Sequence, residues 1–417
     1  VILLLLIVLI IIFVIVNEVK LRQISTNQTG SGSGTVGGSI TGELTAIIKN
    51  EKKEEGTEEN RFYMLSEIDK IKDDLINKEY NNNFTLKEFC EEFRRFSAHR
   101  LKLYYDIEDI RRFVAGLAVT NIIILQGMSG TGKTSLAYAF GEFIKNPSVI
   151  VPVQPMWKER TDLIGYYNEF TKKFNETVLL QKMYEANYSE SMYITVLDEI
   201  NIARIEYYFA EFLSLLELPD FNKRNLDVIS NKWETDPKLL ENGQITLPHN
   251  MWFIGTANND DSTFQISDKV YDRAMVLNLD KKAVPFIVEE SKSIMVTSDK
   301  YYELVSDAKE KYTLSDRNRR RIKRLDEYLI KNYQLTFGNR IMQQINNYVP
   351  VIIACGGSEL EAIDDILSKK VLRKLEAKNL SYVKNTAPAL VSFIEELFGE
   401  NEMSQCKDYV LHIEQNI

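Results

Sequence analysis

The sequence contains few of the side chains that build disulfide frameworks or soft-metal centres. Its 417 residues include three cysteines, which are far apart, and three scattered histidines. An odd number of separated thiols predicts neither a disulfide scaffold nor a zinc site, and reduced thiols fit a cytosolic domain. The histidines are best explained as surface or packing residues. The six residues are Cys90, Cys355, Cys406, His99, His249 and His412.

The chain also lacks an excess of positive charge, since 51 lysines and arginines face 60 aspartates and glutamates. That balance argues against nucleic-acid binding over the whole surface, although a local basic cluster can still bind a nucleic acid. One such cluster is RNRRRIKR, residues 317–324. Two interpretations are open for it. It contacts nucleic acid, or it is a basic helix face that pairs with the acidic surface of this chain, and we favour the second.

One long hydrophobic run stands at the start of the sequence. Residues 1–16 contain no polar side chain, and as a helix they extend about 24 Å, slightly less than the core of a bilayer. A signal-peptide core and a buried helix are the alternatives. Lys20 and Arg22 follow the run, and by the positive-inside rule they place the remaining chain in the cytoplasm. The sequence therefore predicts a membrane anchor over residues 1–22.

The rest of the chain changes composition three times, which fits two or three domains. Residues 23–42 include a Gly/Ser-rich stretch typical of a flexible linker, and residues 43–117 are charged with a helical period. Residues 118–282 alternate short apolar runs with helical patterns, whereas residues 283–417 are mostly helical. The alternation predicts an α/β fold with a parallel five-stranded sheet covered by helices, followed by a C-terminal helical lid domain. The expected strands are 121–125, 148–153, 192–197, 251–257 and 274–279.

The segment GMSGTGKT matches the phosphate-binding pattern G-x-x-x-x-G-K-[ST]. It follows an expected strand and opens an expected helix, so its glycines can turn backbone N–H groups toward phosphate oxygens. We expect Lys133 on the β- and γ-phosphates and the Thr134 hydroxyl on Mg²⁺. The alternative, a glycine-rich turn without nucleotide, is disfavoured by the strand–loop–helix context. The candidate nucleotide-binding residues are Gly127, Ser129, Gly130, Thr131, Gly132, Lys133, Thr134 and Ser135.

Two adjacent acids end the apolar strand in ITVLDEIN, residues 194–201. The carboxyl ends of strands are where open α/β sheets hold their ligands. We expect Asp198 to hold Mg²⁺, mostly through water, and Glu199 to polarise the attacking water. By itself, an apolar strand that ends in two acids is weak evidence for a catalytic site. Its position 65 residues after Lys133, with another expected strand between, makes it much stronger.

Three more residues are candidates for hydrolysis. Asn258 ends another apolar strand, where a neutral amide can orient the lytic water, although turns rich in Asn and Asp are common. Arg273 precedes the last expected strand, and its guanidinium suits the charge on a transferring phosphoryl group. A surface salt bridge to Asp272 is the alternative. Arg340 begins a helix of the C-terminal domain, where it can contact the γ-phosphate and report domain closure.

In this order, the motifs resemble those of AAA+ ATPases. They are most similar to the McrB-like group, the motor subunits of methyl-specific restriction systems, near the MoxR and dynein-related ATPases. The resemblance covers about 118–345, and LDEINIARIEYYFAEFLSLLE, residues 197–217, is its most specific part. Residues 151–174 resemble the group's W…DLxGYYN element. Residues 245–264 and 269–274 resemble its sensor 1 and arginine-finger regions.

The resemblance implies an assembled enzyme. It assigns sensor 1 to Asn258, the group's N-x-x-D element to Asn258 and Asp261, and an arginine finger to Arg273. It also implies a ring of identical subunits, usually a hexamer, with ATP as the default substrate and GTP as the alternative. The classical restriction subunit carries an N-terminal DNA-reading domain, whereas this chain has the apolar run, the linker and charged helices there.

Three functions stay open at this point. The first is a motor that remodels or translocates a partner, with DNA as a possible track and a separate McrC-like nuclease as effector. The second is a MoxR-like chaperone ATPase that remodels a protein complex at the membrane, reached through residues 1–16. The third is a nucleotide-gated scaffold without sustained turnover, and Glu199 argues against it. The sequence shows no second catalytic constellation, so we expect no nuclease activity from this chain.

Overall fold

The computed structural model describes residues 60–258, 263–281 and 283–416. The predicted membrane anchor and Gly/Ser-rich linker both precede residue 60 and lie outside the described residues. From Asn60 onward the chain forms one compact unit. Within the described ranges, no helix has both the length and the apolar composition needed to cross a bilayer.

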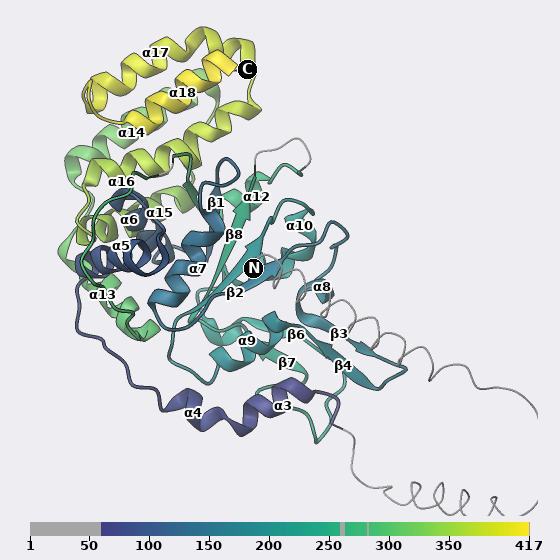
Figure 1. Ribbon diagram of the computed structural model, residues 1–417. Helices are drawn as coiled ribbons and strands as arrows, with labels where there is room; N and C mark the ends of the chain where they lie inside the picture. The colour runs from purple at the N-terminus through teal and green to yellow at the C-terminus, as the bar shows by residue number, and fades with distance from the viewer. Residues whose placement is uncertain (1–59, 259–262, 282, 417) are drawn as a thin grey trace, which may run out of the picture. The chain divides into compact units, whose positions relative to one another are not determined.

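A five-stranded sheet forms the centre of this unit (Figure 1). Its strand order is β2-β5-β8-β1-β9. All four neighbouring pairs are parallel, so the carboxyl ends of the strands lie at one edge. The prediction of a parallel five-stranded sheet is confirmed, and each expected strand is present. Their bounds are β1 Ile122–Gln126, β2 Val149–Pro152, β5 Tyr193–Asp198, β8 Met251–Ala257 and β9 Met275–Asn278.

Helices α5 and α6 belong to the stretch expected to be a charged helical region. The Thr85 hydroxyl and the Glu88 carboxylate form a capping box that starts α5 (Leu86–Leu101). The apolar faces of α5 and α6 (Ile107–Leu117) join the same buried cluster as the sheet and α7 (Lys133–Phe143). Their charges are on the other faces, and the region thus contributes directly to the core behind the phosphate-binding loop.

Two short hairpins interrupt the α/β alternation. One consists of β3 (Gly165–Asn168) and β4 (Lys173–Glu176), the other of β6 (Asn225–Asp227) and β7 (Gln244–Thr246), and both are antiparallel. The tip of the first hairpin exposes the whole side chain of Phe170. The remaining short helices are α3 Tyr63–Lys70, α4 Lys72–Ile76, α8 Thr161–Ile164, α9 Val178–Ala186, α10 Ile205–Tyr208, α11 Ala210–Leu215, η1 Phe221–Lys223 and α12 Asp268–Tyr271.

The C-terminal part of the chain is helical, as predicted. Its helices pack against the sheet unit: the Tyr301 hydroxyl donates a 2.6 Å hydrogen bond to the Val114 carbonyl of α6, and helix α15 contacts both α5 and α6. The sheet and the C-terminal helices therefore share one hydrophobic cluster. The elements are α13 Ser298–Lys311, α14 Asp316–Tyr333, α15 Asn339–Ala354, α16 Glu359–Ile366, the π-helix η2 Leu367–Val371, the 3₁₀-helix η3 Leu372–Ala377, α17 Leu380–Phe398 and α18 Ser404–Asn416.

Candidate functional site

The phosphate-binding loop joins β1 to α7 through glycines with left-handed backbones. Gly127 has φ 142°, and a Cβ there would lie 2.4 Å from the Leu279 carbonyl oxygen. Gly132 has φ 96° and is the N-cap of α7. A side chain at either position would be strained or would clash. The backbone of this loop is therefore set by its glycines, and it leads directly into a helix N-terminus, the arrangement that favours bound anions.

Lys133 is folded back onto its own loop. Its side chain is buried, and Nζ donates 2.9 Å hydrogen bonds to the carbonyl oxygens of Gly127 and Met128. The Tyr105 hydroxyl donates to the Gly132 carbonyl at 3.2 Å, and burial raises the pKa of that hydroxyl well above its usual value. The loop thus holds a buried ammonium group and a neutral phenol beside the start of α7.

Asp198 and Thr134, the two predicted magnesium ligands, are in direct contact. The Thr134 hydroxyl donates to Asp198 Oδ1 at 2.7 Å. Mg²⁺ takes oxygen ligands and usually keeps several waters or phosphate oxygens besides one or two protein groups. A hydroxyl and a carboxylate at the end of the phosphate-binding loop fit that donor set. Among the described residues no group of three or more His, Cys, Asp or Glu side chains could hold a metal ion by itself.

Thr256 is a member of this site that the sequence reasoning missed. Its hydroxyl donates to Asp198 Oδ1 at 2.7 Å and accepts a 2.9 Å hydrogen bond from the Glu199 backbone N–H. Thr256 is buried near the carboxyl end of β8. The available signal was a hydroxyl side chain in an otherwise apolar strand, next to the strand that ends in the two acids. Thr256 therefore fixes the Asp198 carboxylate and the Glu199 backbone relative to each other.

Glu199 has an unusual backbone. Its φ is 57°, a left-handed value that costs non-glycine residues about 1–3 kcal/mol and is common at functional sites. The side chain is exposed, whereas Asp198 is half-buried. The turn directs the two neighbouring carboxylates into different surroundings, as their separate predicted roles require.

Asn258 lies beside the loop in the sheet register. Gln126 is paired with Ala257, so Gly127 and Asn258 are the next residues on adjacent parallel strands. The Asn258 carbonyl accepts a 2.8 Å hydrogen bond from the Asn201 side chain, which holds the backbone after β8. The Asp261 position of the expected N-x-x-D element lies outside the described residues.

The two candidate arginines share one carboxylate. Arg273 Nη2 lies 2.9 Å from Glu217 Oε2, and Arg340 Nη2 lies 2.5 Å from Glu217 Oε1. The alternative expectation for Arg273, an ion pair with Asp272, is wrong, because Asp272 pairs with Lys374 at 3.0 Å. Glu217 was not a candidate from the sequence. The structure thus brings the predicted finger and the predicted lid arginine together.

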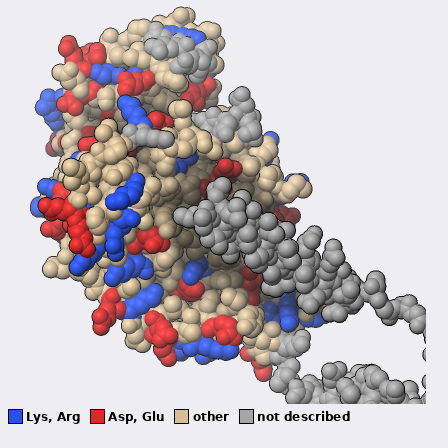
Figure 2. All heavy atoms as spheres, viewed as in Figure 1, with Lys and Arg blue, Asp and Glu red and all other residues tan. Residues whose placement is uncertain are grey.

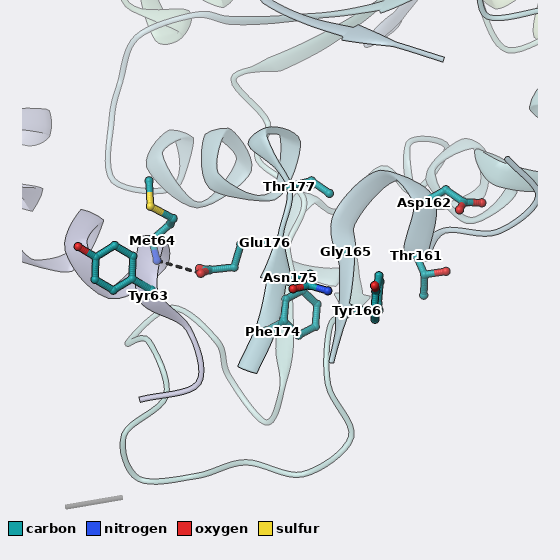
Figure 3. Close-up of a pocket in the computed structure, with 10 residues that line it drawn as sticks. All are labelled: Tyr63, Met64, Thr161, Asp162, Gly165, Tyr166, Phe174, Asn175, Glu176 and Thr177. Atoms are coloured by element: carbon teal, nitrogen blue, oxygen red, sulfur yellow. Dashed lines mark hydrogen bonds between the residues drawn. The ribbon is translucent and has the colours of Figure 1, made fainter. Parts of the chain in front are cut away.

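The structure contains two cavities of interest, and the predicted site residue Asn258 lines the larger one. One, of about 550 Å³, lies between α3 and the β3–β4 hairpin, and Figure 3 shows its lining. Both of its carboxylates are used structurally. Glu176 accepts hydrogen bonds from the backbone N–H groups of Met64 and Leu65 at 2.9 and 2.8 Å, and Asp162 accepts them from those of Lys158 and Glu159. This cavity contains none of the predicted site residues. It is therefore separate from the phosphate-binding loop.

The larger cavity, of about 1030 Å³, lies between the sheet and the C-terminal helices. Asn258 and Gln126 line it from the sheet, and Arg373 and Tyr409 line it from the C-terminal domain. Asp109 of α6 also faces it, and burial raises the pKa of that carboxyl to about 6 against the opposing effect of Arg112. The cavity thus connects the sensor position with the C-terminal domain.

The basic cluster 317–324 forms the first turns of α14. Arg324 pairs with Glu396 at 3.0 Å. Elsewhere on the face seen in Figure 2, acidic and basic side chains are interspersed. The acidic partner expected for the cluster is thus present for Arg324. The other exposed members are Arg317, Arg319, Arg320 and Lys323.

The fold combines a P-loop between β1 and α7, an acid pair at the end of β5, a polar residue after β8 and the strand order β2-β5-β8-β1-β9, which is the arrangement expected of an AAA+ ATPase domain. The family comparison agrees: residues 122–274 match the model described as AAA domain (dynein-related subfamily). Residues 288–417 match a domain of unknown function (DUF8727). Residues 122–274 are therefore similar to AAA domains of the dynein-related subfamily, and residues 288–417 are similar to a second family.

Among solved structures, the full-length MCM homologue from Methanopyrus kandleri is similar at 13% identity and a TM-score of 0.39. The match covers 70% of this chain and 61% of that chain, so this chain spans less than two thirds of its length. A likeness at that score supports no statement about the function of this chain. No curated protein matches the sequence.

Proposed function

We propose that this chain hydrolyses ATP in a ring of identical subunits and uses the energy to remodel or translocate a partner. One observation carries the proposal: the Thr134 hydroxyl, the Asp198 carboxylate and the Thr256 hydroxyl meet within 2.7 Å contacts at the end of the P-loop, with Glu199 next to them. In P-loop NTPases a hydroxyl of the loop and a carboxylate, such as those of Thr134 and Asp198, hold Mg²⁺, and a nearby polar residue orients the attacking water.

The residues divide the work of hydrolysis. The loop N–H groups bind phosphate oxygens, and Lys133 exchanges its two carbonyl partners for the phosphates. Thr134 and Asp198 would hold Mg²⁺, which would supply positive charge to offset the charge of the phosphate oxygens. Glu199 accepts a hydrogen bond from the attacking water and turns its lone pair toward the γ-phosphorus. Asn258 holds that water from the neighbouring strand.

The position of Arg273 supports action on a neighbouring subunit. Arg273 precedes β9, and Met275 of β9 is in register with Ile123, four residues before the loop. Four residues of a strand extend about 13 Å. The start of β9 is therefore about that far, along the strand direction, from Gly127 of the same subunit. The Arg273 Nε is also buried without a partner among the described residues. Arg340 shares the Glu217 carboxylate with Arg273, so we place both arginines at the same interface.

The biological role rests on the sequence resemblance over 118–345, and the McrB-like motor is our first candidate. The exposed basic residues of α14 favour it, because a motor on DNA needs phosphate contacts. The MoxR-like chaperone at a membrane is the second candidate, and the apolar run at residues 1–16 favours it. Stimulation of ATP turnover by duplex DNA distinguishes them.

Two variants test the enzymatic proposal. Lys133→Ala should abolish nucleotide binding, because Lys133 contacts phosphates in the ground state. Glu199→Gln should bind ATP normally and lose turnover by at least about a hundredfold, because a general base acts in the transition state. Nucleotide affinity and steady-state hydrolysis are measured side by side. Turnover at the parental rate in Glu199→Gln would remove the assignment.

A further inference from the structure

The short segment that carries Arg273 is held from the C-terminal domain. Lys370, in the π-helix η2, donates hydrogen bonds from Nζ to the carbonyl oxygens of Tyr271 and Ala274. These two carbonyls lie on either side of Arg273 in the chain, one at the last residue of α12 and the other three residues later. Carbonyls at a helix C-terminus lack intrahelical partners, so a buried lysine there satisfies groups that otherwise have none.

Two side chains of the neighbouring turn also contact this segment. The Arg373 guanidinium lies 3.8 Å over the Tyr271 ring and pairs with Asp268. Lys374 Nζ pairs with the Asp272 carboxylate at 3.0 Å. From α15, the Gln344 amide donates to the Asp272 carbonyl at 3.1 Å. The C-terminal domain thus contacts the segment from Asp268 to Ala274 through four side chains.

Burial of the Lys370 amine costs free energy. The residue is 2% exposed, and burial lowers the pKa of its amine to about 7. The charged groups that face it are Asp272, which favours the charged form, and Arg373, Lys374 and Arg340, which oppose it. The π-helix that presents Lys370 is itself a rare geometry, often found at functional sites. The two carbonyl contacts fix the position of this buried amine, because a buried polar group without partners is strongly destabilising.

We propose that Lys370 is a positioning residue for Arg273, and that the C-terminal domain controls through it the geometry of the finger supplied to the next subunit. The inference rests on the proposed function, in which Arg273 acts across an interface. It assigns a role to residues 288–417 that is independent of the nucleotide contacts. A partner that moves this domain would thereby change hydrolysis in the adjacent site.

The first test is Lys370→Gln, which keeps a polar hydrogen-bonding side chain but is one bond shorter than lysine and loses the amine. We expect ATP affinity within about twofold of the parent, because the P-loop is untouched. We expect kcat to fall by about 10- to 100-fold, since displacement of a catalytic group by about 1 Å costs up to a hundredfold. Lys407→Gln is the matched control. Lys407 also belongs to the C-terminal domain and pairs with Glu395 at 3.1 Å, away from Arg273.

Mixed rings show on which side of the interface Lys370 acts. Glu199→Gln subunits offer a finger but cannot fire their own site, whereas Arg273→Ala subunits do the reverse. Lys370→Gln mixed one-to-one with Glu199→Gln should regain activity, because about a quarter of interfaces in a head-to-tail ring are then sound on both sides. Lys370→Gln mixed with Arg273→Ala should regain none, since both lack a working finger. A purely structural defect does not produce this pattern.

The outcomes separate the two proposals. If Arg273→Ala hydrolyses ATP at the parental rate, the finger assignment fails, and this inference fails with it. If Arg273→Ala is inactive and folded Lys370→Gln is fully active, only the positioning role is overturned. Rescue of Lys370→Gln by Arg273→Ala also overturns it. If Lys370→Gln does not fold, Arg373→Gln is used in the same mixtures, and the same pattern is expected with a smaller loss of kcat.

Discussion

Thr256 connects the metal ligand to the general base through one hydroxyl group. Thr256→Val keeps the shape of the side chain but removes the hydrogen bonds to Asp198 and to the Glu199 N–H. An unsatisfied buried N–H costs about 1–3 kcal/mol. We expect lower stability by that amount, and a kcat at least about tenfold lower with a smaller change in ATP affinity, because the strained turn at Glu199 loses its support.

Thr195→Val is the control for this prediction. Thr195 is equally buried in the same sheet, and its hydroxyl has no partner among the described residues. Valine there should leave stability unchanged or raise it, and should leave kcat at the parental value. Thermal unfolding and steady-state hydrolysis of both variants provide the comparison. Equal effects of the two substitutions would show that Thr256 has no special role.

Asp109 predicts a specific dependence of stability on pH. Burial raises the pKa of its carboxyl from 3.8 to about 6. A raised folded pKa means that the native state binds more protons between about pH 4 and pH 6, so stability is highest below that window and is lost as the pH rises through it. Asp109→Asn should abolish this loss, which amounts to about 3 kcal/mol at most. Denaturant unfolding of both proteins at pH 4.5 and pH 7.5 measures it, and parallel pH profiles would contradict it.

The first turns of α14 provide the test between motor and chaperone at the level of an element. Four basic side chains there are exposed, so the motor role predicts that duplex DNA binds in the micromolar range or weaker and loses affinity steeply with salt. Replacing all four by glutamine should weaken DNA binding without changing basal hydrolysis. Fluorescence anisotropy at several salt concentrations is the measurement. The four residues are Arg317, Arg319, Arg320 and Lys323.

A charge-matched variant controls for net charge. It replaces four exposed basic residues on other elements, which should leave any DNA binding nearly intact. If both variants bind DNA equally well, α14 is not the contact, and if the parent neither binds DNA nor responds to it, the chaperone becomes the better candidate. The control residues are Lys87, Arg100, Lys145 and Lys311.

The elements show how far sequence reasoning reaches in this protein. The five sheet strands were predictable because each is a short apolar run, and four of them are largely buried, whereas the edge strand β2 is only partly buried. The β3–β4 and β6–β7 hairpins were not, because strands of three or four residues carry no clear alternation. Glu217 could not be predicted either, because its ion pairs with Arg273 and Arg340 join residues that are far apart in the sequence. Local patterns thus located the P-loop and the acids, whereas the partners of the arginines needed the fold.

At the scale of the whole molecule, the apolar run at residues 1–16 predicts membrane association. Full-length protein should sediment with membranes and need detergent for extraction, and the chain from residue 29 onward should not. Changing Leu6 and Ile10 to arginine is the matched control, because each charge costs about 2.5–3.5 kcal/mol near the centre of a membrane helix. If all three proteins are soluble without detergent, the run is no anchor.

The two sequence families that divide this chain do not divide its folding. One match ends at residue 274 and the other begins at residue 288, yet a single hydrophobic cluster contains residues from α5, the sheet and α18. A fragment cut at those limits would leave apolar faces of α7 and α15 in water. The two matched stretches are therefore each shorter than the unit that folds. We expect a C-terminal domain transplanted from a relative to keep its stability only when the helices it packs against, α5 and α6, are transplanted with it.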